Sequence, residues 1–318
     1  MSKEEIKDLI ENKEEISKEI EENKEKTIKM IEEIRGRRCY ILVGKDMTEQ
    51  TLELAFEDLE LYYKDCDGRL DVLLDSYGGD MNIAYNLAFL FRKYGHKELS
   101  FIIPRQAKSA ATILACAGDN ILMTDIAELG PIDSQFYSSD PENIANGIDS
   151  LCEKDVSNTL DMIRGEFQKG SKEMAFSMIK GIPSPLLFSR IKRADCLAKH
   201  YFSTILKGRM LKDDAENADK IVEKISKGYP DHGFCINRQE AINMGLKAEA
   251  IQNPLLRKVW ALKMLENKKE GIDIVDSFRE AFEQLESEIG SEFEGSIDSS
   301  SDGHEGIIET GDEATSHS

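Results

Sequence analysis

Between residues 39 and 123 the sequence alternates short apolar runs with longer runs of helical spacing, and this alternation restricts the fold most. The strand-like runs are 39–43, 70–74, 99–103 and 121–123. The helical runs are 48–63, 83–94 and 110–117. Strands that alternate with helices favour an α/β fold with parallel strand pairing. Beyond Pro141 the pattern becomes mostly helical, and no internal repeat is present.

Most of the charge lies at the two ends of the chain. The net charge is −20, and residues 281–318 contain 11 Asp or Glu and no Lys or Arg. Residues 1–34 contain 12 Asp or Glu against 7 Lys. The region between them is close to neutral and offers no basic face, which a nucleic-acid phosphate backbone requires. We therefore expect no nucleic-acid partner.

Composition divides the chain into four parts. Residues 1–36 carry a stripe of Ile and Leu among Glu and Lys, which predicts a charged amphipathic helix. This helix either packs on its own domain or forms a coiled-coil arm in an oligomer. Residues 37–250 are expected to form the α/β domain, and 251–285 a C-terminal helical segment. Residues 286–318 are rich in Ser, Gly, Glu and Asp, which predicts a disordered acidic tail.

Cofactor motifs and targeting segments are absent from the sequence. The six cysteines form no CxxC pair, and neither a GxGxxG motif nor a complete P-loop occurs. We therefore expect no metal and no nucleotide cofactor. The sequence has no apolar leader and no apolar stretch of transmembrane length. These features predict a cytoplasmic chain with no stable membrane insertion.

Two segments that join strands to helices are candidates for chemistry. In "PRQAKSAAT" (104–112), Ser109 is either the N-cap of a short Ala-rich helix or a nucleophile beside the amides that start the helix. In "SYGGD" (76–80), the paired glycines are either a tight turn or a place where backbone amides stay uncovered. Local sequence leaves both alternatives open.

Four segments, taken together and in order, resemble the Clp protease/crotonase superfamily. Within it the sequence is most similar to the serine dehydrogenase proteinase family, which is related to signal peptide peptidase A and the Clp proteolytic subunit. "DSYGGD" resembles the family's Ser-Pro-Gly-Gly turn, with Tyr77 in place of the usual proline, and "AKSAAT" resembles its nucleophile segment. "AELGPID" resembles the strand and loop that follow, and "INRQEAINMGL" the Glu-Ala-x-x-x-Gly-Leu element. The resemblance covers residues 38–250.

The resemblance implies a fold and a nucleophile. The fold is a spiral of β-β-α units followed by a helical C-terminal part. Ser109 is implied to be the nucleophile of an acyl-enzyme mechanism. The amides of Ala110 and of Gly78 or Gly79 are implied to form the oxyanion hole.

The general base is predicted less directly. By the resemblance, Asp133 lies close to where the Clp proteolytic subunit has its histidine, and His232 lies close to where that subunit has its triad aspartate. We therefore predict a triad of Ser109, His232 and Asp133, with two roles exchanged in chain position, provided that the fold brings these residues together. Lys154 is the alternative base, by analogy with the helix lysine of signal-peptide-peptidase-like enzymes. Glu153 and Asp155 beside it favour the charged ammonium, so we favour the histidine.

These residues predict an ATP-independent serine peptidase that acts on a polypeptide and assembles as a homo-oligomer. Two other functions remain as alternatives. One is a catalytically weak scaffold that binds protein partners through the N-terminal helix and the acidic tail. The other is an acyl-CoA enzyme of the crotonase type, in which two backbone amides stabilise an enolate. The nucleophilic serine and the lack of an evident basic site for CoA phosphates argue against the acyl-CoA enzyme.

Overall fold

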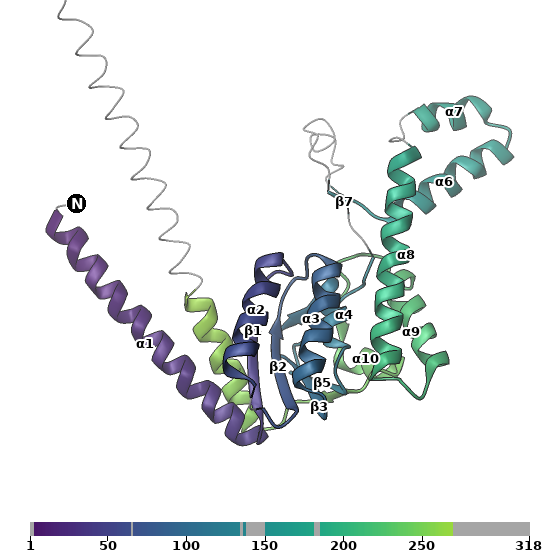
Figure 1. Ribbon diagram of the computed structural model, residues 1–318. Coiled ribbons are helices and arrows are strands. Elements are labelled where there is room, and N and C mark those ends of the chain that lie inside the picture. The colour runs from purple at the N-terminus through teal and green to yellow at the C-terminus, as the bar shows by residue number, and fades with distance from the viewer. Residues whose placement is uncertain (1–2, 65, 134–135, 138–149, 181–184, 270–318) are drawn as a thin grey trace, which may run out of the picture. The chain divides into compact units, whose positions relative to one another are not determined.

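A five-stranded parallel sheet forms the centre of the protein (Figure 1). The computed structural model describes residues 3–64, 66–133, 136–137, 150–180 and 185–269. The chain divides into two compact units, Met1–Asn267 and Lys268–Ser318, and the features described below belong to the first. The sheet order is β1 (Arg38–Val43), β2 (Arg69–Asp75), β3 (Glu98–Ile103), β5 (Asn120–Met123) and β10 (Ala248–Ala250). The predicted α/β fold class is confirmed.

Short strands that follow the central strands form a second, smaller sheet. This sheet contains β4 (Gln106–Ala107), β6 (Glu128–Leu129) and β9 (Ile236–Asn237). Strand β4 follows β3 and β6 follows β5, so each long strand leads into a short one. Strand β6 pairs in parallel with β4 and antiparallel with β9. The second sheet thereby joins the segment that carries Ser109 to segments more than 20 and more than 120 residues away in the sequence. Strands β7 (Phe136–Tyr137) and β8 (Ser150–Leu151) form a separate antiparallel pair.

Several helices begin at a polar residue whose side chain caps the first turn. Thr48 caps α2, Asp80 caps α3 and Asn237 caps α10, and each side chain accepts a hydrogen bond from an amide of the first turn. Residues 255–267 are also helical. The helices are α1 (Lys3–Arg35), α2 (Glu49–Tyr62), α3 (Met81–Tyr94), α4 (Ala110–Ala115), α6 (Glu153–Gln168), α7 (Lys172–Lys180), α8 (Pro185–Gly208), α9 (Ala215–Lys227) and α10 (Arg238–Met244).

Alternate side chains of the central sheet enter two different cores. One core contains side chains such as Val72 and Phe101 together with α2, α3, α4, α8 and α9. The other contains Leu73 and Ile102, the next residues along the same strands, and covers the opposite face. A strand that is buried on both faces reads as a continuous apolar run, which is why the strands are evident in the sequence. Helix α4 lies wholly in the first core, since all six of its residues are buried.

Helix α1 and residues 255–267 cover the second face of the sheet. Ile31 of α1 is buried there with Leu255, Val259 and Leu262. Lys24 of α1 also forms an ion pair of 2.9 Å with Glu266. The C-terminal half of α1 therefore packs on its own domain, the first of the two alternatives given by the sequence. The predicted tail at 286–318 and residues 270–285 of the predicted helical segment lie outside the described residues.

Two aspartates of β2 lie on this second face. Asp71 is fully buried and receives two hydrogen bonds from Arg35 at the end of α1, of 2.5 and 3.2 Å. Asp75, at the carboxyl end of the strand, forms an ion pair with Lys263 from residues 255–267. Each covering helix is thus fixed to the sheet by a charge pair as well as by apolar contacts.

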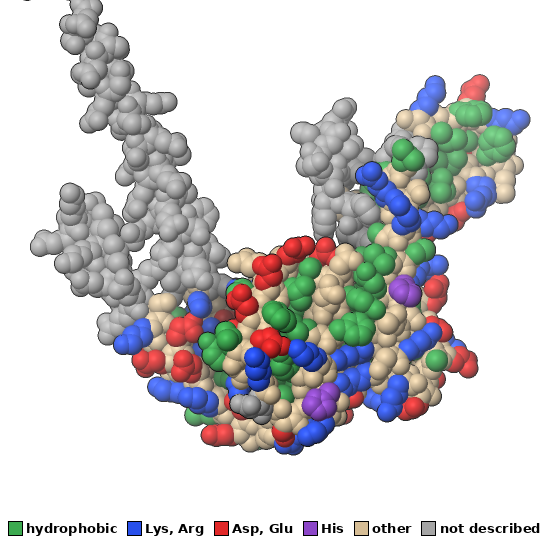
Figure 2. Space-filling view, in the orientation of Figure 1, with side chains coloured by type: hydrophobic (Ala, Val, Ile, Leu, Met, Phe, Trp, Pro, Cys, Tyr) green, Lys and Arg blue, Asp and Glu red, His purple; other side chains and the backbone are tan. Residues whose placement is uncertain are grey.

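Several large apolar side chains are exposed on α6, α7 and the start of α8 (Figure 2). They are Leu160, Met162, Phe167, Met174, Phe176, Ile179 and Leu186. Among the described helices, none is both long enough and apolar enough to cross a membrane.

The buried pair of Asp71 and Arg35 predicts a large effect of a conservative substitution. Asp71→Asn leaves the Arg35 guanidinium without a carboxylate beside the sheet. We expect the free energy of unfolding to fall by about 3 kcal/mol, measured by urea denaturation. Glu216→Gln is the control, because Glu216 pairs with Lys220 on an exposed surface of α9, where we expect no measurable change. Equal effects of the two substitutions would contradict the structural role of the buried pair.

Candidate active site

Ser109 occupies a strained turn between β4 and α4. Its backbone angles are φ +49° and ψ −120°, and it is the one non-glycine residue with positive φ among the described residues. Such conformations are costly and concentrate at functional sites. Ser109 stands at the N-cap position of α4, yet its hydroxyl makes no capping hydrogen bond. The structure therefore does not support the N-cap alternative, and the hydroxyl is left for another use.

Hydrogen bonds on both sides of Ser109 hold the turn. The segment before it pairs with Ser76, because Ser76 N–H donates to Gln106 O and Lys108 N–H donates to Ser76 O, both at 3.0 Å. After it, Thr112 N–H donates to the Ser109 carbonyl at 2.9 Å. These bonds place the segment that carries Ser109 directly against the turn that follows β2.

Gly78 and Gly79 make this close approach possible. Their φ angles are +112° and +128°, which residues with a side chain rarely adopt. A Cβ at Gly78 would lie 2.7 Å from the Lys108 carbonyl oxygen and 3.0 Å from Ser109 Cβ. A Cβ at Gly79 would lie 2.8 Å from the Met47 nitrogen. The structure thus brings the predicted oxyanion-hole glycines together with Ser109.

The amides beside Ser109 differ in their availability. Gly78 N–H donates to Ser76 Oγ at 3.0 Å, so this donor is already used. Among the hydrogen bonds of the described residues, none uses the N–H of Gly79 or of Ala110. A Cβ at Gly78 would also lie 3.2 Å from the Ala110 nitrogen, so that nitrogen lies beside the glycine turn. The sequence did not decide which of the two glycines supplies an oxyanion-hole amide, and Gly79 is the one with an available N–H.

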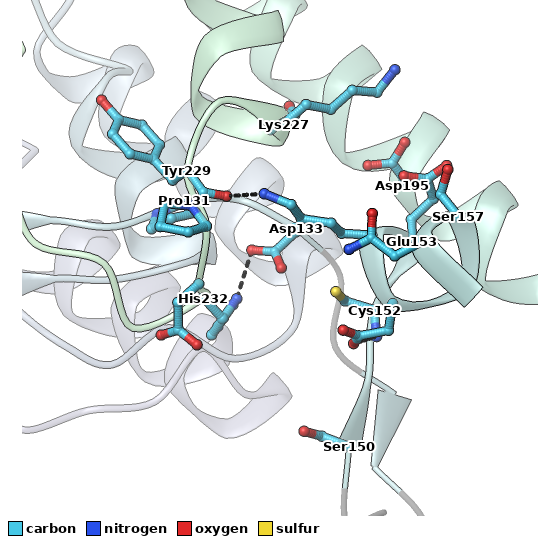
Figure 3. A pocket seen from close by; sticks show the side chains of 16 residues that line it. Pro131, Asp133, Ser150, Cys152, Glu153, Ser157, Asp195, Lys227, Tyr229 and His232 are labelled. Atoms are coloured by element: carbon cyan, nitrogen blue, oxygen red, sulfur yellow. Dashed lines mark hydrogen bonds and ion pairs between the residues drawn. The ribbon is translucent and has the colours of Figure 1, made fainter. Parts of the chain in front are cut away.

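His232 and Asp133 are in direct contact. His232 Nδ1 lies 2.7 Å from Asp133 Oδ1, although 99 residues separate them in the chain (Figure 3). Burial tends to raise the pKa of Asp133, but the hydrogen bond and charge of His232, with a hydrogen bond from Cys152, hold it below its ordinary value. The carboxylate is therefore ionised at neutral pH. It accepts the Nδ1–H bond, so Nε2 of a neutral imidazole is left as a proton acceptor.

The Cys152 side chain is hydrogen-bonded to the Asp133 carboxylate. Burial raises the pKa of the Cys152 thiol to about 12, so the thiol stays protonated and has a hydrogen to donate to Asp133. The sequence analysis did not assign Cys152 a role, because only the fold brings the start of α6 beside the Asp133 loop.

Lys154 also lies near the histidine turn. Its Nζ donates to the Tyr229 carbonyl oxygen at 2.6 Å. Lys154, His232 and Asp133 line a cavity of about 510 Å³, shown in Figure 3. Ser109 is not among the described residues that line this cavity.

The turn that carries Ser109 and the turn that carries His232 touch through residues next to these two. Among the described residues, no hydrogen bond joins Ser109 Oγ to His232 or to Lys154. However, Lys108 Nζ lies 3.5 Å from the Gly233 carbonyl oxygen and 3.2 Å from that of Phe234. Residues adjacent to Ser109 and to His232 therefore touch. The sequence signal for Lys108 was its position as a lone charged residue in a run of small residues.

A metal site is not evident at this position. No group of three or more His, Cys, Asp or Glu side chains with a metal-binding arrangement occurs within the part of the chain that the structure describes.

The approach of Gly78 to Ser109 predicts a specific effect of Gly78→Ala. The added Cβ meets backbone atoms on both sides of Ser109, the predicted nucleophile, so we expect the rate at which a fluorophosphonate labels Ser109 to fall on the order of 10²-fold. Gly170→Ala is the matched control, because Gly170 has a φ of +86° with nothing within 4 Å of an added Cβ. We expect this control to lose about 1–2 kcal/mol of stability and to keep its labelling rate. A wild-type labelling rate in Gly78→Ala would rule out the close packing of this turn on the nucleophile.

Comparisons with known proteins give only distant similarities. No protein-family model matches the chain. An uncharacterized protein of Methanocaldococcus jannaschii is 24% identical over 184 residues, which are 58% of this chain and 54% of that protein. The chain thus spans about half the length of the curated relative it matches.

Similar solved structures include a mutant of the 1510-N membrane-bound stomatin-specific protease, with 14% identity and a TM-score of 0.42 over 69% of this chain and 83% of that one. They also include ClpP1 from Listeria monocytogenes, with 11% identity and a TM-score of 0.37 over 68% and 91% of the two chains. The ClpP catalytic domain from Plasmodium falciparum has 14% identity and the same TM-score over 68% and 86%. At such values these neighbours assign no activity to this chain. Membership of the serine dehydrogenase proteinase family stays a prediction.

Proposed function

We propose that this chain is a serine peptidase that acts through an acyl-enzyme on Ser109. The observation that carries the proposal is the positive φ of Ser109, combined with a hydroxyl that makes no capping bond. A serine with only a structural role does not require a strained backbone conformation. A nucleophile gains an exposed oxygen at a sharp turn between a strand and a helix.

In the proposed acylation step, Ser109 Oγ attacks the carbonyl carbon of a peptide bond and its proton passes to Nε2 of His232. The carbonyl electrons move onto the oxygen, and the N–H groups of Gly79 and Ala110 stabilise the resulting oxyanion. Asp133 stabilises the imidazolium that forms. The C–N bond then breaks, and the leaving amine takes the proton from His232.

In the proposed deacylation step, a water molecule attacks the ester carbonyl and gives its proton to His232. The bond between the acyl carbon and Ser109 Oγ breaks, and the serine recovers its proton. Neither step needs a metal ion or a nucleotide. Among the described residues no hydrogen bond joins Ser109 to His232, and the proposal requires this bond to form when substrate binds, as catalytic hydrogen bonds often do.

His232 is preferred to Lys154 as the base for a reason of geometry. The Lys154 ammonium is engaged with the Tyr229 carbonyl oxygen. His232, in contrast, is oriented by Asp133 through one ring nitrogen, which is how a base is prepared to accept a proton at the other. Lys154 is accordingly assigned to holding the turn that carries the histidine.

The proposal predicts how labelling by a fluorophosphonate depends on pH. Ser109→Ala is expected to abolish labelling and keep the fold, as checked by circular dichroism. In the wild type the labelling rate is expected to fall as the pH is lowered, because a protonated imidazole cannot accept the serine proton. Protonation of Asp133 does not cause this fall. The pKa of Asp133 lies below the ordinary value for an aspartate, so the carboxylate stays ionised in mildly acidic solution. His232→Ala is expected to slow labelling by about 10²–10⁴-fold and to remove the acidic limb.

Lys154→Met is the matched variant for the alternative base. We expect it to keep the acidic limb of the labelling profile. If the limb disappears in Lys154→Met and remains in His232→Ala, the base is the lysine. If the folded wild type is not labelled at any pH, the peptidase proposal is wrong and the scaffold alternative gains support.

A further inference from the structure

Lys108, the residue before the proposed nucleophile, makes an unusual set of contacts. Its Nζ lies 3.4 Å from the Leu129 carbonyl oxygen, 3.5 Å from that of Gly233 and 3.2 Å from that of Phe234. It also forms an ion pair of 3.3 Å with Glu128. The side chain is only 13% exposed. One ammonium group therefore joins three segments that are distant in the sequence.

The chemistry of an ammonium group suits this position. It has three N–H donors and no acceptor, and the groups that surround it are all acceptors. The contacts with the Leu129 and Phe234 carbonyl oxygens are partly buried, where an acceptor without a donor is costly, and Lys108 supplies donors to both loops. Glu128, which is itself buried and also pairs with Arg105 at 3.0 Å, balances the charge. A neutral side chain of similar length fills the space and loses these bonds.

The turn that carries His232 is held at both of its ends. Lys154 of α6 donates to the Tyr229 carbonyl oxygen at the start, and Lys108 reaches the carbonyls of Gly233 and Phe234 at the end. The rings of Tyr229 and Phe234 stack with centroids 4.5 Å apart, so the two ends of the turn are in contact. His232 lies between these fixed points, so a shift of either end moves its imidazole.

Lys108 differs from Lys154 in what it connects. Lys154 fixes the histidine turn to α6, whereas Lys108 is covalently adjacent to Ser109 and fixes the histidine turn to the nucleophile turn itself. Its aliphatic chain also packs on Gly130, where an added Cβ would lie 2.8 Å from Lys108 Cδ. The segment that leads to Asp133 is thus part of the same contact.

We propose that Lys108 is a positioning residue: its bonds to the Gly233 and Phe234 carbonyls set the distance between the His232 imidazole and the Ser109 hydroxyl. This inference rests on the proposed function, in which His232 accepts the Ser109 proton. Lys108 does not touch the reacting atoms and acts only through His232. Misplacement of a base by about 1 Å is enough to slow a reaction on the order of 10²-fold.

The test compares three variants by the second-order rate of fluorophosphonate labelling at Ser109. Lys108→Met keeps the length of the side chain and removes every donor, and we expect labelling to slow on the order of 10²-fold. Lys108→Arg keeps donors and charge, and we expect it to recover most of the rate. Lys212→Met is the control, since Lys212 is exposed, and we expect the wild-type rate. Lys108→Gln, which keeps an amide donor, replaces the methionine variant if that variant does not fold.

A double-substitution experiment separates positioning from general stabilisation. If Lys108 acts through His232, Lys108→Met causes no further loss when it is added to His232→Ala. A further loss of the same size in that background would show that Lys108 acts independently, and the proposal would fail. A wild-type labelling rate in folded Lys108→Met would also overturn it.

An NMR measurement distinguishes failure of this inference from failure of the proposed function. The ring signals of His232 report its contact with Asp133 whether or not the chain is a peptidase. We expect Lys108→Met to shift these signals and Lys212→Met to leave them unchanged. Shifted signals in a protein that is never labelled would refute the peptidase function and keep the structural coupling. Unshifted signals would refute the coupling itself.

Discussion

The backbone conformation of Ser109 is the constraint on which the candidate site depends. A residue with a side chain at φ +49° and ψ −120° is strained by about 1–3 kcal/mol and persists only where its surroundings enforce it. Here the enforcement comes from the pairing of Ser76 with β4 and from the close approach of Gly78 to the Lys108 carbonyl. The same contacts leave the amides of Gly79 and Ala110 without a partner among the described residues.

A closed ring of contacts joins the three proposed catalytic segments. From Ser109 the chain continues to Thr112, whose hydroxyl oxygen lies 3.0 Å from both the nitrogen and the carbonyl oxygen of Gly130. Gly130 leads to Asp133, which binds His232. The residue after His232 contacts Lys108, which precedes Ser109. Because the ring is closed, each of the three segments is in contact with the other two through named side chains.

The strands and helices were evident from local sequence because burial on both faces leaves a clear apolar signal. The run predicted at 39–43 is strand Arg38–Val43, and the helical run predicted at 83–94 is α3 (Met81–Tyr94). Local sequence was unable to decide the role of Ser109, since an N-cap and a nucleophile occupy the same place before a helix. In the structure the Ser109 hydroxyl makes no capping hydrogen bond, and only the folded chain determines whether that bond forms.

Contacts over long sequence separations were less accessible to prediction. The resemblance suggested that Asp133 and His232 meet, but the contact of Lys108 with Gly233 spans 125 residues and has no local signature. The packing of residues 255–262 on the sheet was also missed, because it depends on which strand residues face α1. The homo-oligomer and the acidic tail stay predictions.

A crystal structure of the fluorophosphonate adduct tests the central claim most directly. The account predicts a covalent bond from phosphorus to Ser109 Oγ, with the phosphoryl oxygen within hydrogen-bond distance of the nitrogens of Gly79 and Ala110. It also predicts that Nε2 of His232 faces Ser109 Oγ while Nδ1 stays bound to Asp133. An adduct on another residue, or a phosphoryl oxygen turned away from both amides, would contradict it.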